Sequence, residues 1–291
     1  MATRQSNIVT DLGVDAGPRT SLLWCTTANY AAKSVVHTHN RDLRSALREA
    51  GTVSGTRDSY DRIADDYAAR FRDELLTKPL DRALLDALAE EVNTLGPIAD
   101  VGCGPGHVAG YLHDRGIAAI GVDLSPRMID IARTAHPDIE FVIADMCDLP
   151  VPDRSWGGIV ALYSIIHIPP AQLADVFVEF RRVLRQGATM LLSFHVGDEA
   201  RHATEMLGHT VDLDFQFYDR QFVQSALEQA GFAVNAYLER LHYETEVATT
   251  RGYLMARRAQ AGEQGADSQA SAHPFGRQGE RHPMRHPNEN R

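Results

Sequence analysis

Three glycines stand at alternate positions directly after a short apolar run. The segment reads Asp100-Val101-Gly102-Cys103-Gly104-Pro105-Gly106. Glycines permit a tight turn and bring the backbone close to a ligand, and a helix that starts there offers free N–H groups. Asp123 ends the next apolar run, at a spacing where a carboxylate can accept hydrogen bonds from a ribose diol. Together these residues predict a ligand-binding turn between a strand and a helix.

The spacing of the glycines argues against a dinucleotide. It is G-x-G-x-G, whereas dinucleotide-binding turns carry G-x-G-x-x-G. Asp100 also stands two residues before the first glycine, and its carboxylate would repel a pyrophosphate but not a ligand with an ammonium group. The alternative interpretation is a turn whose glycines serve backbone geometry alone.

Two histidines follow apolar runs further along the chain and are candidate general bases. His167 comes a few residues after the run 158–163, and His195 ends Ser193-Phe194-His195. Histidine is the natural base near neutral pH, and ligands of open α/β sheets lie beyond the carboxyl ends of the strands. Tyr163 is a candidate for orienting a substrate, and His209 is a weaker candidate base. The alternative for each is a structural or merely solvated side chain.

The elements that must position these residues alternate along the chain. Residues 60–71 and 80–92 have the apolar spacing of amphipathic helices, and strands and helices then follow in turn. This order predicts an α/β fold: a Rossmann-like, doubly wound, mostly parallel seven-stranded sheet with helices on both faces. The expected strands are 97–101, 118–123, 140–144, 158–163, 189–195, 232–239 and 253–257, and the further helices are 107–115, 126–135, 171–184 and 219–230.

The chain divides into three parts by composition. Residues 1–56 show no sustained period apart from a short helical pattern at 42–50, and we expect a poorly ordered extension there. Residues 57–258 form the expected folded domain, in which 57–95 are a helical lid and 196–218 an insertion that covers the substrate. Residues 259–291 are rich in Gly, Gln, His, Arg and Pro, and such a segment buries too little apolar surface to fold.

Composition excludes several classes of protein. The 291 residues carry a formal net charge of −10, and residues 57–258 alone hold 19 Lys/Arg against 31 Asp/Glu. Such a body repels phosphate backbones, so we expect no nucleic-acid partner. No apolar run reaches the roughly 18 residues of a membrane span, and no secretory signal is evident. Three scattered cysteines predict neither disulfides nor a zinc site, so we expect a cytoplasmic protein without membrane attachment.

Several motifs in order resemble class I S-adenosylmethionine-dependent methyltransferases, of the small-molecule type common in bacteria. The resemblance covers about residues 57–258. Its motifs are the glycine segment 100–106; Val122-Asp123-Leu124-Ser125; Ala144-Asp145-Met146 followed by Leu149-Pro150; the apolar run 161–168; Tyr60-Asp61-x-x-Ala64-x-x-Tyr67; and Arg182-Val183-Leu184-x-x-Gly187.

The resemblance implies S-adenosylmethionine as the cofactor, with Asp123 at its ribose and Asp145 facing its adenine amino group. The candidate catalytic residues are His167, His195 and Tyr163. The cofactor-binding residues that it implies are Tyr60, Tyr67, Asp100, Gly102, Cys103, Gly104, Gly106, Asp123, Leu124, Ser125, Met128, Asp145 and Met146.

The implied reaction is in-line transfer of a methyl group to an O or N atom of a small-molecule metabolite, by a monomer or homodimer. Residues 163–166 hold no carboxylate, whereas metal-binding members of the family carry acids just before the equivalent histidine, so we expect no metal. The motif of nucleobase and glutamine amino-methyltransferases is also absent. Two alternatives stay open: a catalytically inactive, methyltransferase-like binding protein, and a nicotinamide-dependent oxidoreductase.

Overall fold

The structure is a computed structural model that describes residues 52–92 and 94–259. The described residues fall within one compact unit, residues 49–291. The expectations for residues 1–51 and for the tail 260–291 lie outside the described residues. Helix α2 (Thr52–Phe71) begins inside the stretch that we expected to be an extension, so the lid helix is longer than its apolar pattern predicts.

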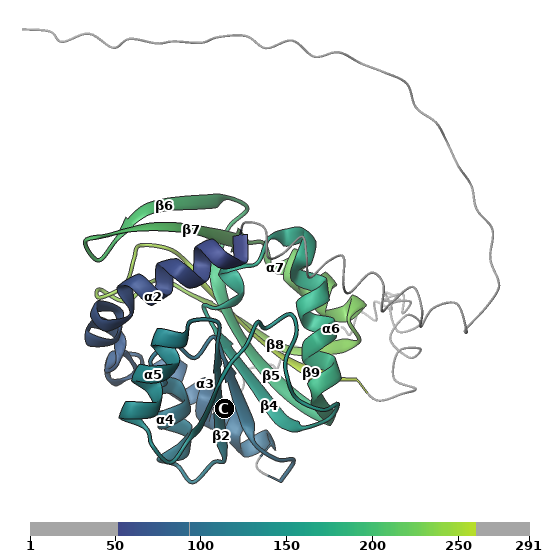
Figure 1. The fold of residues 1–291 in the computed structure, drawn as a ribbon. Coiled ribbons are helices and arrows are strands. Elements are labelled where there is room, and N and C mark those ends of the chain that lie inside the picture. The colour runs from purple at the N-terminus through teal and green to yellow at the C-terminus, as the bar shows by residue number, and fades with distance from the viewer. Residues whose placement is uncertain (1–51, 93, 260–291) are drawn as a thin grey trace, which may run out of the picture. The chain divides into compact units, whose positions relative to one another are not determined.

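The central sheet confirms the predicted fold class (Figure 1). Five parallel strands lie in the order β3-β2-β1-β4-β5, followed by β9 and β8, and β9 runs antiparallel to both of its neighbours. Their bounds are β1 Ile98–Val101, β2 Ala119–Asp123, β3 Glu140–Ile143, β4 Trp156–Leu162, β5 Leu184–Val196, β8 Phe232–Arg240 and β9 Arg251–Arg258.

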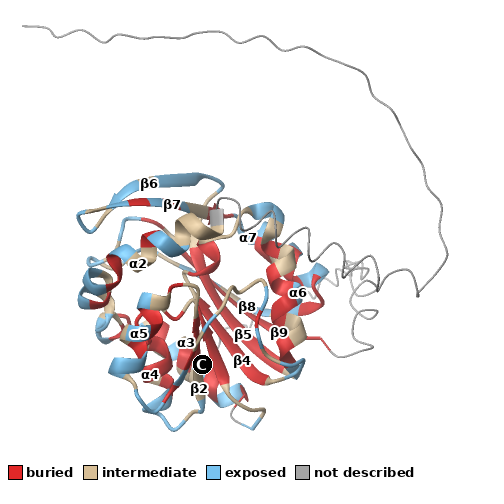
Figure 2. Cartoon of the chain, viewed as in Figure 1, coloured by how far each residue is buried: buried red, intermediate tan, exposed pale blue. Residues whose placement is uncertain are grey.

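Helices cover both faces of this sheet. Alternate strand residues point to opposite faces, so Ile98 and Val160 pack with α3 (Pro79–Val92) and α4 (His107–His113), while Ala99 and Ile159 pack on the side of α6 (Leu173–Val183) and α7 (Arg220–Gln229). Helix α5 (Pro126–Ala135) packs against β2 and β3. Figure 2 shows the resulting buried strands between the helical layers. Short 3₁₀ turns lie at η1 (Glu74–Thr77), η2 (Ile165–His167) and η3 (Pro170–Gln172).

A β-hairpin occupies the region where we expected an insertion without strands. Strands β6 (Ala200–Met206) and β7 (His209–Tyr218) pair antiparallel, and β7 joins the end of β5 through His195↔Phe217. Within the described residues, the sheet therefore has nine strands instead of the predicted seven. The alternation Val211, Leu213, Phe215, Phe217 is the strand signal that the sequence analysis missed.

The hairpin packs against helix α2 through an apolar contact. Ile63 of α2 is buried with Val211 and Leu213 of β7. Both elements lie over the carboxyl ends of the parallel strands (Figure 1). Among the described helices, none is long and apolar enough to cross a membrane.

Candidate active site

The glycine turn connects β1 to α4 in a conformation that requires glycine. Gly102 has φ +79°, and a Cβ there would lie 2.3 Å from the Cβ of Ser164. Ser164 follows β4 and donates a hydrogen bond from its hydroxyl to the carbonyl of Val101 at 2.7 Å. The loops after β1 and β4 therefore touch, because no side chain separates them.

Asp123 links the end of β2 to this turn. Its Oδ2 accepts a hydrogen bond from the backbone N–H of Gly104 at 2.8 Å, and its Oδ1 accepts one from Ser125 N–H at 2.9 Å. Burial raises the pKa of the Asp123 carboxyl, although these backbone hydrogen bonds oppose the rise. A carboxylate has about four acceptor positions, so Asp123 can still accept a hydroxyl of a diol.

Asp100 lies beneath the turn and is buried. Its Oδ2 accepts a hydrogen bond from the N–H of Ala109 at 3.2 Å. Burial raises the pKa of Asp100 to about 7, against the opposing effects of His107 and of this hydrogen bond. His107, at the start of α4, is in turn held by Glu74 of η1, whose Oε1 lies 2.8 Å from His107 Nε2.

The other predicted cofactor residues surround the same turn. Asp145 follows β3, is partly exposed, and accepts a hydrogen bond from Cys147 N–H at 2.8 Å. Leu124 and Met146 are also partly exposed after β2 and β3, whereas the side chains of Cys103, Ser125 and Met128 are buried behind the turn.

Helix α2 is fastened over this turn by a residue whose role the sequence analysis missed. Asp61 accepts hydrogen bonds from the hydroxyl of Ser125 at 2.5 Å and from Arg127 N–H at 3.0 Å, so it joins α2 to the start of α5. The rings of Tyr60 and Tyr67 lie 5.7 Å apart on α2, and Tyr67 would be 3.8 Å from a Cβ on Gly104.

His167 lies between the lid helix and the hairpin. Its Nδ1 is 2.9 Å from the carbonyl of Asp214, which can only accept, so Nδ1 carries the hydrogen. Its Nε2 lies 2.8 Å from the hydroxyl of Tyr60 and accepts the hydrogen bond. Burial lowers the pKa of His167 to about 4. The one lone pair of this neutral imidazole is therefore engaged by Tyr60.

His195 is held by a cation at the end of β5. Arg251 Nη1 lies 2.5 Å from His195 Nδ1, and the hydroxyl of Thr249 lies 2.9 Å from the same atom. Since the guanidinium can only donate, Nδ1 accepts and Nε2 carries the hydrogen. Burial, and then the charge of Arg251, lower the pKa of His195 to about 4. Its ring lies 5.6 Å from that of Tyr163 and 5.1 Å from that of Phe217.

Tyr163 stands directly after β4 with φ +53°, which is unusual for a residue with a side chain. Its hydroxyl lies 2.9 Å from that of Tyr253, which donates to Asp81 Oδ1 at 3.0 Å. Two cations lie over the Tyr163 ring, Arg251 at 5.3 Å and Lys78 at 5.6 Å. Tyr163 is thus the partly exposed end of a buried polar network.

This network couples α3 to the last two strands and was not predicted. Glu246 forms ion pairs with Lys78 at 3.2 Å and Arg240 at 2.6 Å, and Arg240 also pairs with Asp81 at 3.3 Å. Although burial opposes it, the hydrogen bond from Arg240 holds the pKa of Glu246 at about 2. These partners come from distant parts of the chain, so no local pattern could have indicated them.

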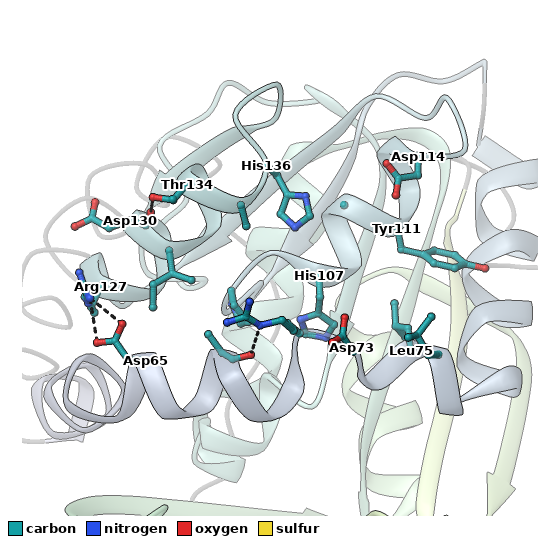
Figure 3. Close-up of a pocket in the computed structure, with 17 residues that line it drawn as sticks. Asp65, Asp73, Leu75, His107, Tyr111, Asp114, Arg127, Asp130, Thr134 and His136 are labelled. Carbon is teal, nitrogen blue, oxygen red and sulfur yellow. Dashed lines mark hydrogen bonds and ion pairs between the residues drawn. The ribbon is translucent and has the colours of Figure 1, made fainter.

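A cavity of about 680 Å³ lies next to the glycine turn and is lined by Pro105 and His107 (Figure 3). It lies between α2, α4 and α5. Asp65 and Ala68 line it from a face of α2 other than that of Tyr60 and Tyr67, and Arg72 lines it just after the helix ends. Arg127 bonds both carboxylate oxygens of Asp65 at its rim, at 2.8 and 3.0 Å. Acidic and basic side chains are mixed around this cavity.

The remaining predicted candidate lies apart from the turn. His209 pairs with Asp66 of α2 at 2.7 Å, near the outer end of the hairpin. Within residues 52–92 and 94–259, no group of three or more His, Cys, Asp or Glu side chains is placed to hold a metal ion.

Comparison with known proteins finds similarity to methyltransferases. Residues 98–187 match a family model described as a methyltransferase domain. An O-methyltransferase of Penicillium expansum is 28% identical over 163 residues, which are 51% of this chain and 58% of that protein. The biotin biosynthesis bifunctional protein BioHC of Cellvibrio japonicus is 26% identical over 218 residues, 72% of this chain and 42% of that protein. The chain thus spans about half the length of these relatives.

One further relative matches strongly over a short segment. Trans-aconitate 2-methyltransferase of Escherichia coli is 53% identical over 61 residues, which are 20% of this chain and 21% of that protein.

Solved structures agree on the fold. A methyltransferase from Methanosarcina mazei superposes with a TM-score of 0.54 and 17% identity, over 59% of this chain and 96% of that one. A methyltransferase from Clostridium acetobutylicum gives a TM-score of 0.51 and 14% identity, over 69% of this chain and 99% of that one. Both are S-adenosylmethionine-dependent by description, and at such identity the likeness concerns the fold.

Proposed function

The chain carries a class I S-adenosylmethionine-dependent methyltransferase domain, and on that premise we propose that it methylates an O or N atom of a small-molecule metabolite. S-adenosylmethionine is the cofactor of this family. The observation that carries the proposal is the connection of Asp123 to the glycine turn through Gly104 N–H at 2.8 Å. This hydrogen bond places a carboxylate that can accept a ribose diol next to a glycine turn whose backbone a ligand can approach closely.

The residues around the turn fit the chemistry of this cofactor. Its sulfonium and ammonium groups are positive, and the turn is bordered by carboxylates rather than by arginine or lysine: Asp100 below it and Asp123 beside it. We assign the ribose to Asp123 and the adenine amino group to Asp145, with Gly102, Gly104 and Gly106 shaping the loop. Tyr60 and Tyr67 of the lid are assigned to its outer side.

The acceptor belongs beyond the ends of β4 and β5 in this proposal. When bound, S-adenosylmethionine supplies an electrophilic methyl group, and the protein must hold the nucleophile in line with it. Correct positioning alone can lower such a barrier by roughly 7–11 kcal/mol. Tyr163, the rings of His167 and His195, and Phe215 and Phe217 of the hairpin are the side chains available to orient the acceptor.

The two histidines differ in their availability as bases. His167 becomes a base once the hydroxyl of Tyr60 leaves its Nε2, for example when an acceptor hydroxyl takes that place. His195 would have to break its contact with Arg251, and a protonated Nδ1 would then face that cation. We therefore propose His167 as the base for acceptors that carry a proton, and His195 as a hydrogen-bond donor through Nε2.

Charge and relatives support a small acceptor. The balance of −12 over residues 57–258 disfavours nucleic acid. Two of the similar proteins are described as an O-methyltransferase and a trans-aconitate methyltransferase. A metal-independent reaction and a cytoplasmic location are part of this proposal.

The proposal is tested by incubating the full chain with S-adenosylmethionine labelled in its methyl group and a panel of phenols, amines and carboxylic acids. We expect label in one class of small product, together with S-adenosylhomocysteine. Tight binding of S-adenosylmethionine with no transfer to any class would favour the inactive, methyltransferase-like binding protein instead.

A further inference from the structure

Six arginines gather at the edge of the sheet opposite to the glycine turn. Strand β4 starts at Trp156 beside Leu184 of β5, and β9 ends at Arg258 beside Phe232 of β8. Segments 152–155, 179–186 and 257–259 meet at this edge. They carry the arginines Arg154, Arg181, Arg182, Arg185, Arg257 and Arg258, against the acids Asp153 and Glu179. The patch is basic in a domain that is otherwise acidic.

Both acids of the patch are held by one arginine. Arg182 bonds the two oxygens of Glu179 at 2.8 and 2.7 Å and Asp153 Oδ1 at 2.9 Å. Glu179 also accepts the N–H of Leu149 at 2.8 Å. Arg185 is bonded to two backbone carbonyls instead of an acid. Arg182 thus pairs with both acids of these segments.

Arg258 is a buried cation with little to offset its charge. Its side chain lies at the end of β9 with the residue only 7% exposed. Nη1 donates to the carbonyl of Leu184, while Nε is buried and has no hydrogen-bond partner among the residues that the structure describes. Burial lowers the pKa of Arg258, and the charges of Arg181 and Arg154 lower it further, against a smaller opposing effect of Asp153.

Arg181 lies beside the same strand end. It comes from the last turn of α6, and a Cβ on Gly231 would lie 2.7 Å from its Nε, which is also buried without a partner. Gly231 accepts the N–H of Ala259, the residue after Arg258, at 3.2 Å. Among the residues that the structure describes, neither Arg181 nor Arg154 is in an ion pair. The charges of Arg181 and Arg154 both act on Arg258, and no acid within residues 52–92 and 94–259 forms an ion pair with any of the three.

We propose that Arg154, Arg181 and Arg258 form a binding site for a tetrahedral oxyanion of the phosphate class, free or as a monoester. Guanidinium groups present forked N–H donors that match such oxygens, and a dianion would balance like charges that otherwise repel. The site lies at the sheet edge remote from the glycine turn, so its occupant is neither the cofactor nor the methyl acceptor. The proposal goes beyond the methyltransferase function and is tested independently of it.

The test is calorimetric titration of the full chain with sodium phosphate near pH 7.5, compared with sodium chloride at equal ionic strength. We expect saturable phosphate binding and a rise in the thermal midpoint that chloride does not produce. Arg181→Gln and Arg154→Gln should each weaken phosphate affinity roughly tenfold, the effect of losing one charge-assisted contact. Arg115→Gln is the matched control, because Arg115 is exposed and paired with Asp86, and it should leave the affinity unchanged.

A second titration with glycerol phosphate separates the two sources of the anion. If both inorganic phosphate and glycerol phosphate bind, the site accepts phosphate monoesters. If inorganic phosphate alone binds, the site is specific for the free ion. Arg258→Met removes the buried charge and can impair folding, so Arg181→Gln and Arg154→Gln carry the test. A phosphate titration that matches chloride, or equal affinity in the wild type and both of these variants, would overturn the proposal.

Discussion

The hydroxyl of Tyr163 donates a hydrogen bond to the hydroxyl of Tyr253 across 2.9 Å. The direction follows from the neighbours of Tyr253, whose only proton is donated to Asp81 at 3.0 Å and whose oxygen also accepts from Arg240 Nε at 3.0 Å. Tyr163 therefore keeps oxygen lone pairs that can accept a hydrogen bond from a methyl acceptor. The buried network at α3 and β9 thus determines the direction of the hydrogen bond made by the Tyr163 hydroxyl, after the end of β4.

Substituting Tyr253→Phe should slow methyl transfer without weakening cofactor binding. The hydroxyl proton of Tyr163 would then lose its acceptor on Tyr253. The hydroxyl could rotate, and its oxygen would no longer be held in the direction that accepts a hydrogen bond from the methyl acceptor. Loss of one hydrogen bond of about 1.4 kcal/mol corresponds to a roughly tenfold lower rate. Turnover is measured on the acceptor class found by label transfer, and cofactor affinity by calorimetry. Tyr237→Phe is the control, since its hydroxyl bonds Glu239 on the same strand β8. An equal loss in both variants would contradict the assignment.

Substituting Asp123→Asn should weaken S-adenosylmethionine binding. The change preserves size but removes the charge that accepts from Gly104 and Ser125 and that we assign to the ribose. A hydrogen bond to a charged group contributes about 1.5–3 kcal/mol, which predicts a roughly 10- to 150-fold higher Kd. Asp130→Asn, on the exposed side of α5, should bind as the wild type does. Unchanged affinity in Asp123→Asn would refute the ribose assignment.

The lid should loosen when Asp61 is replaced by alanine. Asp61 holds both Ser125 and Arg127 N–H at the start of α5, so its removal should lower the free energy of unfolding by about 1–2 kcal/mol. Asp65→Ala breaks only an exposed pair with Arg127 and should cost less than about 1 kcal/mol. Urea unfolding compares the two variants, and hydrogen exchange should be faster in α2 of the first. Equal stability of both would show that Asp61 does not fasten the lid.

The succession of strands and helices along the chain and the position of the glycine turn could be predicted, because both are local properties of the sequence. Asp100, Gly104 and Asp123 stand in one short stretch, and the apolar runs that flank them define the strands. The positions of His167 and His195 after two parallel strands could also be predicted, and both lie near the carboxyl ends of β4 and β5. What each histidine bonds could not be predicted, because Asp214 and Arg251 reach them from other elements.

Long-range polar contacts account for most of what was missed. Asp81 meets Tyr253 across 172 positions of sequence, and Asp61 meets Ser125 across 64. Such pairs leave no periodic signal. The β6–β7 hairpin is a different case, because β7 has a clear alternation of apolar residues that we passed over as a polar stretch.

Acid should destabilise the protein through His167. Its folded-state pKa of about 4 lies below the ordinary 6.5, so an unfolded chain binds a proton that the folded chain does not. The free energy of unfolding is unaffected by this group above about pH 6.5 and falls as the pH decreases toward 4. Between pH 7 and 4.5 the wild type should lose on the order of 2 kcal/mol more than His167→Gln, measured by urea unfolding. Parallel curves for the two proteins would show that His167 is not held neutral.

The central claim is that the glycine turn and Asp123 bind S-adenosylmethionine and not a dinucleotide. It is tested most directly by calorimetry of the full chain with S-adenosylmethionine, S-adenosylhomocysteine and NADH. We predict micromolar binding of the first two and none of NADH. Binding of NADH, or of none of the three, would contradict the account and leave the function of the turn to be found again.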